Sequence, residues 1–114
     1  MTPITGNIYL ADLPMDGNQQ GGKRPVIVTQ NNKGNEYGER VHVVPLSKRI
    51  NKASHLPTHV VIKPTKENGL RYLSVALAEN LQSVQKSRLL ACIGHVEDDN
   101  YDKVAEAIKI HLAI

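Results

Sequence analysis

The sequence predicts a small, mainly β domain in which a barrel-like antiparallel sheet is closed by a C-terminal α-helix. Short runs of alternating or β-branched residues recur along most of the chain, and clusters of Gly, Asn and Pro separate them. A helical period is clear only near the C-terminus. Because 114 residues provide room for a single core, we expect one domain over residues 1–114.

Five apolar runs are expected to form strands. These are residues 7–13 (NIYLADL), 26–30 (VIVTQ), 41–46 (VHVVPL), 59–63 (HVVIK) and 74–78 (SVALA). The segment 81–96 is ambiguous, and we interpret it as a short strand, one helical turn near residues 86–89 and another strand through Cys92 and Ile93.

The C-terminal helix is predicted from the spacing of its apolar residues. Positions i, i+3, i+4, i+7 and i+11 are occupied by Tyr101, Val104, Ala105, Ile108 and Leu112, which would line one face. We expect Asp98 or Asp99 to cap the N-terminus, where the helix dipole favours acidic residues.

Composition limits the classes of function. The chain is 40% hydrophobic and 22% charged, which is ordinary for a globular protein. It has no run of about 18 apolar residues, and its N-terminus lacks a basic region followed by a long apolar one, so we expect neither a membrane span nor a Sec signal. The single cysteine, Cys92, cannot form an internal disulfide, and the cytoplasm is the expected location.

The charge is distributed unevenly, although the net charge is only +3. Between residues 20 and 52, seven basic residues face two acidic ones, whereas residues 97–106 carry five acidic residues and one lysine. A polyanion or an acidic partner would therefore be drawn to the first half of the chain. The plainer alternative is a solvated basic face.

The long loop of residues 14–24 has the spacing of a phosphate-binding P-loop without its context. The pattern GxxxxGK begins at Gly17, but Arg24 stands where a Ser or Thr is needed, and a strand follows instead of a helix. We therefore reject a nucleotide site. Gly21 and Gly22 would let the backbone approach a ligand closely, and the planar guanidinium of Arg24 suits a phosphate. Alternatively, Arg24 is an ordinary surface residue.

We expect neither a metal site nor a nucleophilic cysteine. Pro57 lies between His55 and His59 and prevents the helix that would place both on one face, so surface histidines are expected. His42 is expected on the polar face of its strand. Cys92 lies in an apolar run, which favours a buried side chain.

Residues 18–35 (NQQGGKRPVIVTQNNKGN) closely resemble the signature of the PemK/MazF family of toxin endoribonucleases. The most specific element is the block G-G-x-R-P-V-I-V-x-Q-N, with a hydroxyl residue, Ser47, after the third expected strand. Further similar segments are VVPLSKRINK (43–52), LPTHV (56–60), GLRYLSVALA (69–78) with Glu79-Asn80, and DKVAEAIKIHLAI (102–114). The resemblance covers nearly the whole chain.

The resemblance implies a fold, an assembly and an activity. The fold would be an SH3-like barrel of the CcdB/PemK type with a C-terminal helix, paired as a two-fold homodimer whose groove takes an RNA strand. The activity would be sequence-specific, metal-independent cleavage of single-stranded RNA, including mRNA, with no cofactor and with neutralisation by a cognate antitoxin. By position, Arg24 and Ser47 match the catalytic Arg and Thr/Ser of the family.

The implied reaction fits these residue types. The 2′-OH attacks the adjacent phosphorus in line and leaves a 2′,3′-cyclic phosphate and a 5′-OH, so DNA should be inert. Arg24 would donate two hydrogen bonds to the nonbridging oxygens, and Ser47 would supply a further donor or an orienting contact. The general base stays open, because Gln19 stands where many family members have a carboxylate and an amide cannot take the proton.

Base recognition is expected to use amides and loop backbone, because the chain has four tyrosines and neither Trp nor Phe. Tyr37 could stack on a base, although a tyrosine without that role is the plainer interpretation. The expected RNA-binding residues are Gln19, Gln20, Lys23, Asn31, Asn32, Lys48, Ser74 and Asn80, the last at a position where the family usually has Gln. Arg49 and Lys52 would add phosphate contacts, so salt should weaken binding.

Two alternatives remain open. The same fold is shared with CcdB-type gyrase poisons, which bind a protein target and cleave nothing, and Gln19 keeps this alternative open. The other is a degenerate family member that only binds antitoxin. The antitoxin itself is expected to be acidic and partly disordered, wrapping the basic groove with its negative segment.

Overall fold

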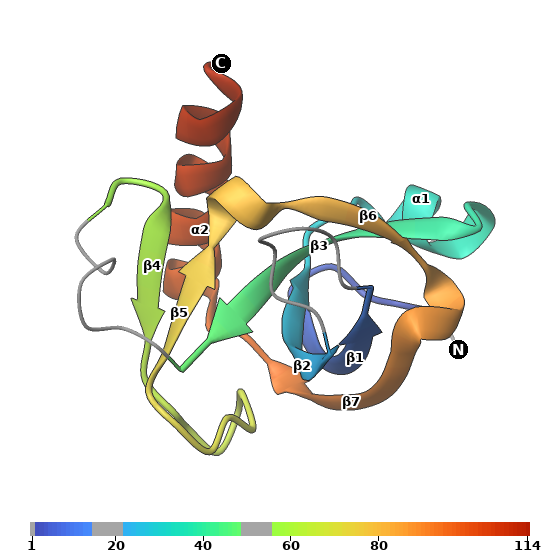
Figure 1. Ribbon diagram of the computed structural model, residues 1–114, viewed down its shortest axis with the longest axis horizontal. Coiled ribbons are helices and arrows are strands. Elements are labelled where there is room, and N and C mark those ends of the chain that lie inside the picture. Colours follow the sequence, from blue (N-terminus) through green and yellow to red (C-terminus); the bar gives the residue numbers. More distant parts are fainter. Residues whose placement is uncertain (1, 15–21, 49–55) are drawn as a thin grey trace.

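The computed structural model describes residues 2–14, 22–48 and 56–114. The elements in chain order are β1 (Asn7–Leu13), β2 (Gly22–Val28), α1 (Asn32–Tyr37), β3 (Arg40–Ser47), β4 (His59–Ile62), β5 (Ser74–Leu77), η1 (Ala78–Asn80), β6 (Gln82–Gln85), η2 (Lys86–Arg88), β7 (Leu89–His95) and α2 (Asp98–Leu112). The strands pair in the order β4-β5-β3-β2-β1-β7, and β6 pairs with β3. Figure 1 shows β6 and β7 curving around β1, β2 and β3, with α2 beside β4 and β5. The mainly β architecture with a C-terminal helix is confirmed.

Strands β1, β2 and β3 bury side chains on both of their faces, and each face belongs to a different hydrophobic cluster. Successive side chains of a strand point to opposite faces. In β3, Val41 and Val43 belong to the cluster inside the curled sheet, whereas Val44 and Leu46 belong to the cluster under α2. These burial demands explain why the strand runs are nearly continuously apolar and not strictly alternating.

The expected strands are confirmed with small shifts at their ends. The first runs over the same residues as β1, and β3 is one residue longer at each end. The exception is β2, which begins at Gly22 and not at residue 26, because residues 22–25 pair with β1 from Leu13 back to Leu10. The ambiguous segment 81–96 folds as interpreted, into β6, η2 and β7.

Helix α1 was not expected, because the sequence shows a clear helical period only near the C-terminus. The helix is polar. Local and tertiary hydrogen bonds stabilise it, whereas most helices are stabilised by packing of an apolar face. The side chain of Asn31 caps it by accepting a hydrogen bond from the Gly34 N–H at 2.9 Å. Asn35 is fully buried, and its amide donates to Gln30 O at 3.1 Å.

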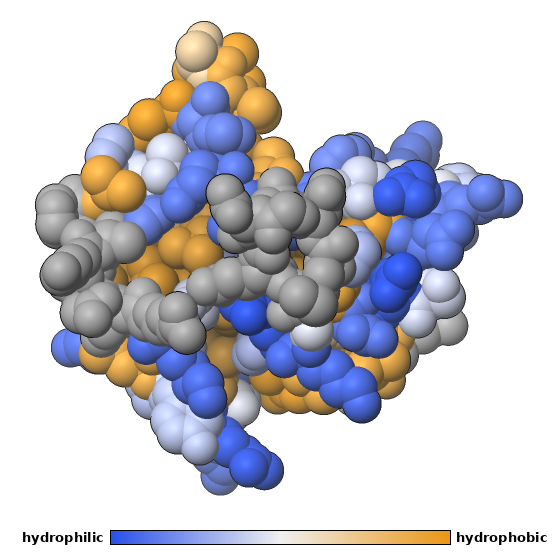
Figure 2. Space-filling view, viewed as in Figure 1, coloured by the Kyte–Doolittle hydropathy of each residue, from blue (hydrophilic) through white to orange (hydrophobic). Residues whose placement is uncertain are grey.

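Helix α2 differs from the prediction at its cap and on its buried face. Its N-cap is Glu97, which precedes the expected Asp98 by one residue and the expected Asp99 by two. Val104 is buried as expected, but Ala107 is the second buried residue, and Leu112 is 50% exposed. The reason is that the C-terminal end of α2 extends beyond the sheet (Figure 1), where apolar side chains gather on the surface (Figure 2).

Two further expectations concern exposure. His42 is exposed on its strand, as predicted. Cys92 is also exposed, so the expectation of a buried cysteine was wrong. It lies on β7, the last strand in the pairing order, which pairs with β1 alone. None of the helices in the three described ranges is long and apolar enough to cross a membrane.

Candidate active site

Arg24 and Ser47 lie on the same face of the sheet at the same end of β2 and β3. Val26 pairs with Pro45 in the antiparallel register of these strands. Arg24 is two residues before Val26 and Ser47 is two residues after Pro45, so both side chains point to the face shared by that pair. Arg24 is partly buried, and Ser47 is only 7% exposed. A guanidinium and a hydroxyl from positions far apart in the sequence are therefore expected on one side of the sheet, near the neighbouring ends of β2 and β3.

The start of β2 is set by Gly22. Its φ of +84° lies in the region that favours glycine, and a Cβ at this position would meet no atom within 4 Å. The conformation and the open space fit the expectation that the backbone here can approach a ligand. Lys23 follows and is exposed. Gln19, Gln20, Arg49 and Lys52 lie outside the described residues.

Lys48 and Ser74 gather at the same end of the sheet as Ser47. Lys48 directly follows Ser47, which pairs with Val75 of β5. The Oγ of buried Ser74 donates a hydrogen bond to the carbonyl oxygen of Tyr72 at 2.8 Å. The Lys48 Nζ lies 4.6 Å from the centroid of the Tyr72 ring.

An imidazole–carboxylate pair lies further along the face that carries Ser47. The Nε2 of His59 is 2.6 Å from the Oε2 of Glu79. Burial would raise the pKa of Glu79, but hydrogen bonds from His59, the backbone and Thr58 outweigh it and lower the pKa. His59 is buried, so the expectation of a surface histidine was wrong at this position. Its partner lies 20 residues away in the sequence, a proximity that no local pattern reveals.

Asn80, the expected counterpart of the family's Gln, is the last residue of η1 and directly follows Glu79. Its side chain is partly exposed, and its carbonyl oxygen accepts a hydrogen bond from Gln82 Nε2 at 3.2 Å. The structure therefore attaches Asn80 to the turn that the His59–Glu79 pair holds against β4.

Asn31 and Asn32 lie at the opposite end of β2 from Arg24. Asn31 caps α1, and the Oδ1 of Asn32 accepts hydrogen bonds from the Thr5 N–H at 2.9 Å and from Asn35 Nδ2 at 3.1 Å. The structure thus gives both side chains local partners and does not bring them together with Arg24 and Ser47.

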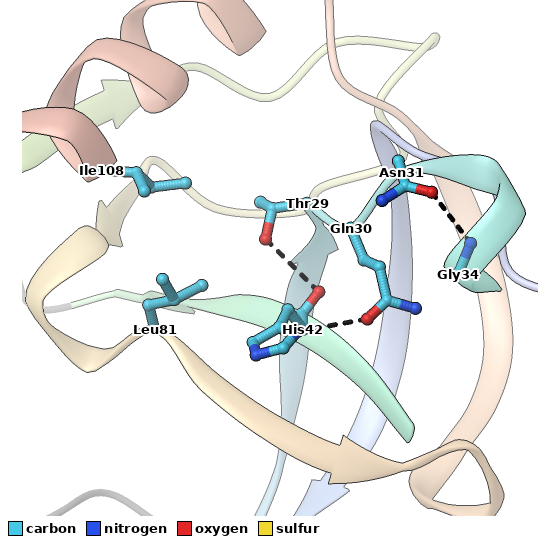
Figure 3. A pocket seen from close by; sticks show the side chains of 7 residues that line it. All are labelled: Thr29, Gln30, Asn31, Gly34, His42, Leu81 and Ile108. Carbon is cyan, nitrogen blue, oxygen red and sulfur yellow. Dashed lines mark hydrogen bonds between the residues drawn. The ribbon is translucent and has the colours of Figure 1, made fainter. Parts of the chain in front are cut away.

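A cavity of about 410 Å³ also lies at that far end (Figure 3). Leu81 and Ile108 line one side of it, and Gln30 and Asn31 line the other. The Nδ1 of His42 is 3.1 Å from Gln30 Oε1. The cavity contains neither Arg24 nor Ser47, so it is separate from the site that they form.

Within the described ranges, no group of three or more His, Cys, Asp or Glu side chains is placed to hold a metal ion.

Comparison with known proteins agrees with the sequence signature. The profile of the family described as PemK-like, MazF-like toxin of type II toxin-antitoxin system matches residues 4–112. The chain belongs to this family. A relative, Endoribonuclease EndoA of Bacillus subtilis (strain 168), is 44% identical over 110 residues, which cover 96% of this chain and 93% of the relative.

Solved structures of the family share the fold. MazF (Form-I) from Deinococcus radiodurans superposes with a TM-score of 0.82 at 24% identity, covering 100% of this chain and 99% of that one. An endoribonuclease in complex with its cognate antitoxin from Mycobacterial species superposes with a TM-score of 0.80 at 24% identity, covering 98% of this chain and 96% of that one. The predicted fold class is thereby confirmed.

Proposed function

We propose that this toxin-family endoribonuclease cuts single-stranded RNA, including mRNA, at a short sequence through metal-independent attack by the 2′-OH. The products would be a 2′,3′-cyclic phosphate and a 5′-OH. The observation that carries the proposal is the common face and common strand end of Arg24 and Ser47. The 44% identity with an endoribonuclease supports it.

Arg24 and Ser47 have complementary roles in this mechanism. The guanidinium of Arg24 donates two charge-assisted hydrogen bonds to the nonbridging oxygens, and the Ser47 hydroxyl donates another. These donors stabilise the negative charge that builds up as the 2′-oxygen bonds to phosphorus and the 5′-oxygen leaves. The loss of one such preorganised donor costs roughly 10²–10³ in rate. Water accepts the 2′-OH proton and water donates a proton to the leaving 5′-oxygen, which becomes the 5′-OH, while positioning supplies much of the acceleration.

Four of the proposed RNA-binding residues, Lys23, Lys48, Ser74 and Asn80, are on the strands and turns around this site. Lys23 and Lys48 are exposed beside Arg24 and Ser47 and would contact phosphates. Ser74 and Asn80 flank β5 and η1 and would contact bases or sugars. Gln19, Gln20, Asn31 and Asn32 remain proposed RNA contacts, of which the two asparagines would have to act away from the scissile linkage.

The proposal includes partners and a location. We propose a cytoplasmic homodimer that forms the RNA groove, neutralised by an acidic, partly disordered antitoxin. The cognate-antitoxin complex among the similar structures supports the second partner. The excess of basic residues between positions 20 and 52 supports the expected acidity of that partner.

The experiment is cleavage of an RNA ladder by the purified full chain in the presence of EDTA. We expect discrete fragments with 5′-OH ends from the wild-type protein and none from Arg24→Ala, with the far-ultraviolet circular dichroism unchanged. Lys33→Ala, which removes an exposed charge on α1, is the matched control and should cleave normally. Full activity of Arg24→Ala would refute the assignment. Intact RNA together with growth arrest would favour a gyrase-binding toxin instead.

A further inference from the structure

The segment between β4 and β5, residues 63–73, is held by the buried Asn68. The side chain of Asn68 is fully buried, and its Oδ1 accepts hydrogen bonds from the N–H groups of Thr65 and Leu70, both at 3.0 Å. Its amide donates to Glu97 Oε1 at 3.3 Å, and the Thr65 hydroxyl donates to the other oxygen of the same carboxylate. The segment is therefore tied to the N-terminus of α2.

Gly69 fixes the same segment against β7. Its φ is +70°, and a Cβ at this position would lie 1.9 Å from the Ile93 carbonyl oxygen. The two backbones therefore cross in direct contact, which only glycine permits. The His95 N–H also donates to Glu67 O at 3.0 Å. The backbone of this segment is therefore held in place by contacts with β7 and with the N-terminus of α2.

Tyr72 is an exposed aromatic side chain of the same segment. It is 58% exposed, and its carbonyl oxygen accepts the hydrogen bond from Ser74. The Lys48 ammonium lies 4.6 Å from the ring centroid, within the range of a cation–π interaction. The segment therefore presents an aromatic plane and a positive charge together, before any ligand binds.

This pair lies next to the proposed catalytic residues. Lys48 directly follows Ser47 in the chain, and Tyr72 is three residues before Val75, the partner of Ser47 in the β3–β5 register. An RNA strand whose scissile phosphate meets Arg24 and Ser47 would therefore pass the end of β3 and β5 at which Lys48 and Tyr72 stand.

We propose that Tyr72 and Lys48 form a nucleotide subsite for single-stranded RNA, in which the ring stacks on one unpaired base and the ammonium contacts a neighbouring phosphate. The inference rests on the proposed function and extends it to a nucleotide beside the cleaved linkage. Every base has a π face, so the ring would tolerate different bases but require an unstacked one. The subsite would thereby select single strands over duplexes.

The absence of tryptophan from the chain provides a direct binding test. Tyr72→Trp introduces a unique fluorophore at the subsite, and Leu112→Trp introduces the same fluorophore at a 50% exposed position near the end of α2. The probes are random-sequence single-stranded 2′-O-methyl oligoribonucleotides, which lack the attacking hydroxyl, together with polyphosphate and polyglutamate. We expect saturable quenching of Tyr72→Trp by the oligonucleotides alone, and no quenching of Leu112→Trp.

A kinetic test uses any RNA that the wild-type protein cleaves. Loss of one base-stacking contact in Tyr72→Ala should raise KM roughly 5- to 150-fold, with a much smaller effect on kcat. Tyr72→Phe keeps an aromatic ring and should rescue KM. Lys66→Ala, an exposed charge in the same segment, should behave like the wild-type protein. If Tyr72 had only a structural role, Tyr72→Ala would lower stability and would not raise KM selectively over kcat.

The outcomes separate this inference from the proposed function. If the wild-type protein cleaves RNA while Tyr72→Ala has an unchanged KM and Tyr72→Trp is not quenched, the subsite is refuted and the proposed function stands. Response to polyglutamate in place of the oligonucleotides would also refute it, in favour of an acidic protein segment. If the wild-type protein cleaves nothing, the proposed function fails, and the quenching experiment alone decides whether Tyr72 binds an unpaired base.

Discussion

Arg24 and Ser47 each lie two residues beyond the Val26–Pro45 pair, and they project from the same face at one end of β2 and β3. Arg24 pairs with Ala11 of β1 and Ser47 pairs with Val75 of β5, so the backbone that carries each side chain is held in the sheet and not in a loop. This relationship leads to the first prediction.

Arg24→Lys should lower kcat by roughly 10²–10³, nearly as much as Arg24→Ala, because lysine keeps the charge but loses the fork of donors that fits two phosphate oxygens. Single-turnover cleavage of one RNA substrate measures this effect. Ser47→Ala should also lower kcat, while Ser47→Thr retains the hydroxyl and should retain most activity. Equal rates for Arg24→Lys and the wild-type protein would mean that charge alone is sufficient.

Loss of the Asn68 side chain should destabilise the fold. Asn68→Ala leaves the N–H groups of Thr65 and Leu70 without their acceptor, and the bond to Leu70 is buried, where an unsatisfied group costs about 1–3 kcal/mol. Urea denaturation should therefore show a lower midpoint for this variant. Lys66 is exposed in the same segment, so Lys66→Ala should change the urea midpoint no more than an ordinary surface substitution does. An unchanged midpoint for Asn68→Ala would contradict the role of this side chain.

The carboxylate of Glu97 makes stability depend on acid pH. Burial would raise the pKa of Glu97, but hydrogen bonds from Thr65, the backbone, Asn68 and Asn100 outweigh it and lower the pKa below 4.5. The unfolded chain therefore binds the proton more readily, and this contribution is full above about pH 4.5 and is lost as the pH falls through the lowered value.

Glu97→Gln should consequently lose less stability than the wild-type protein on acidification from neutral pH to below 4.5. Urea midpoints measured along this pH series provide the comparison. Glu79, whose pKa is also lowered, would keep part of the acid dependence in the variant. Parallel pH profiles for the two proteins would argue against the contribution of Glu97.

The two candidate roles of Asn31 can be separated by substitution. Asn31→Ser keeps a cap for α1 but removes the amide, whereas Asn31→Ala removes both. We expect Asn31→Ala to lower the unfolding free energy by about 0.5–2 kcal/mol and Asn31→Ser to lower it much less. Filter binding of RNA by Asn31→Ser then reports the amide alone. A fall in affinity in that variant would support the proposed RNA contact, and unchanged affinity would leave Asn31 as a cap.

The fold was predictable from local pattern wherever burial imposes one. The run 7–13 matches β1 throughout because its side chains are buried or half-buried along its length. Helix α1 escaped prediction because its stability comes from Asn31, Asn35 and their polar partners, which leave no apolar period. Residues 22–25 resemble a loop in composition, and only the pairing with β1 makes them a strand.

The candidate site was predictable by resemblance and much less by pattern. Arg24 and Ser47 were singled out together through the family signature, but their common face depends on the register of β2 and β3. Tyr72 was missed, because its contact with Lys48 joins two segments that are far apart in the sequence. The pairing of His59 with Glu79 is hidden in the same way.

Strand β3 contributes Val41 and Val43 to one hydrophobic cluster and Val44 and Leu46 to the other. Unfolding of either cluster would therefore remove packing contacts from β3, the strand that ends in Ser47. Heat or denaturant should therefore abolish native packing and catalytic competence in one cooperative step, and fragments retaining half of the molecule should be inert.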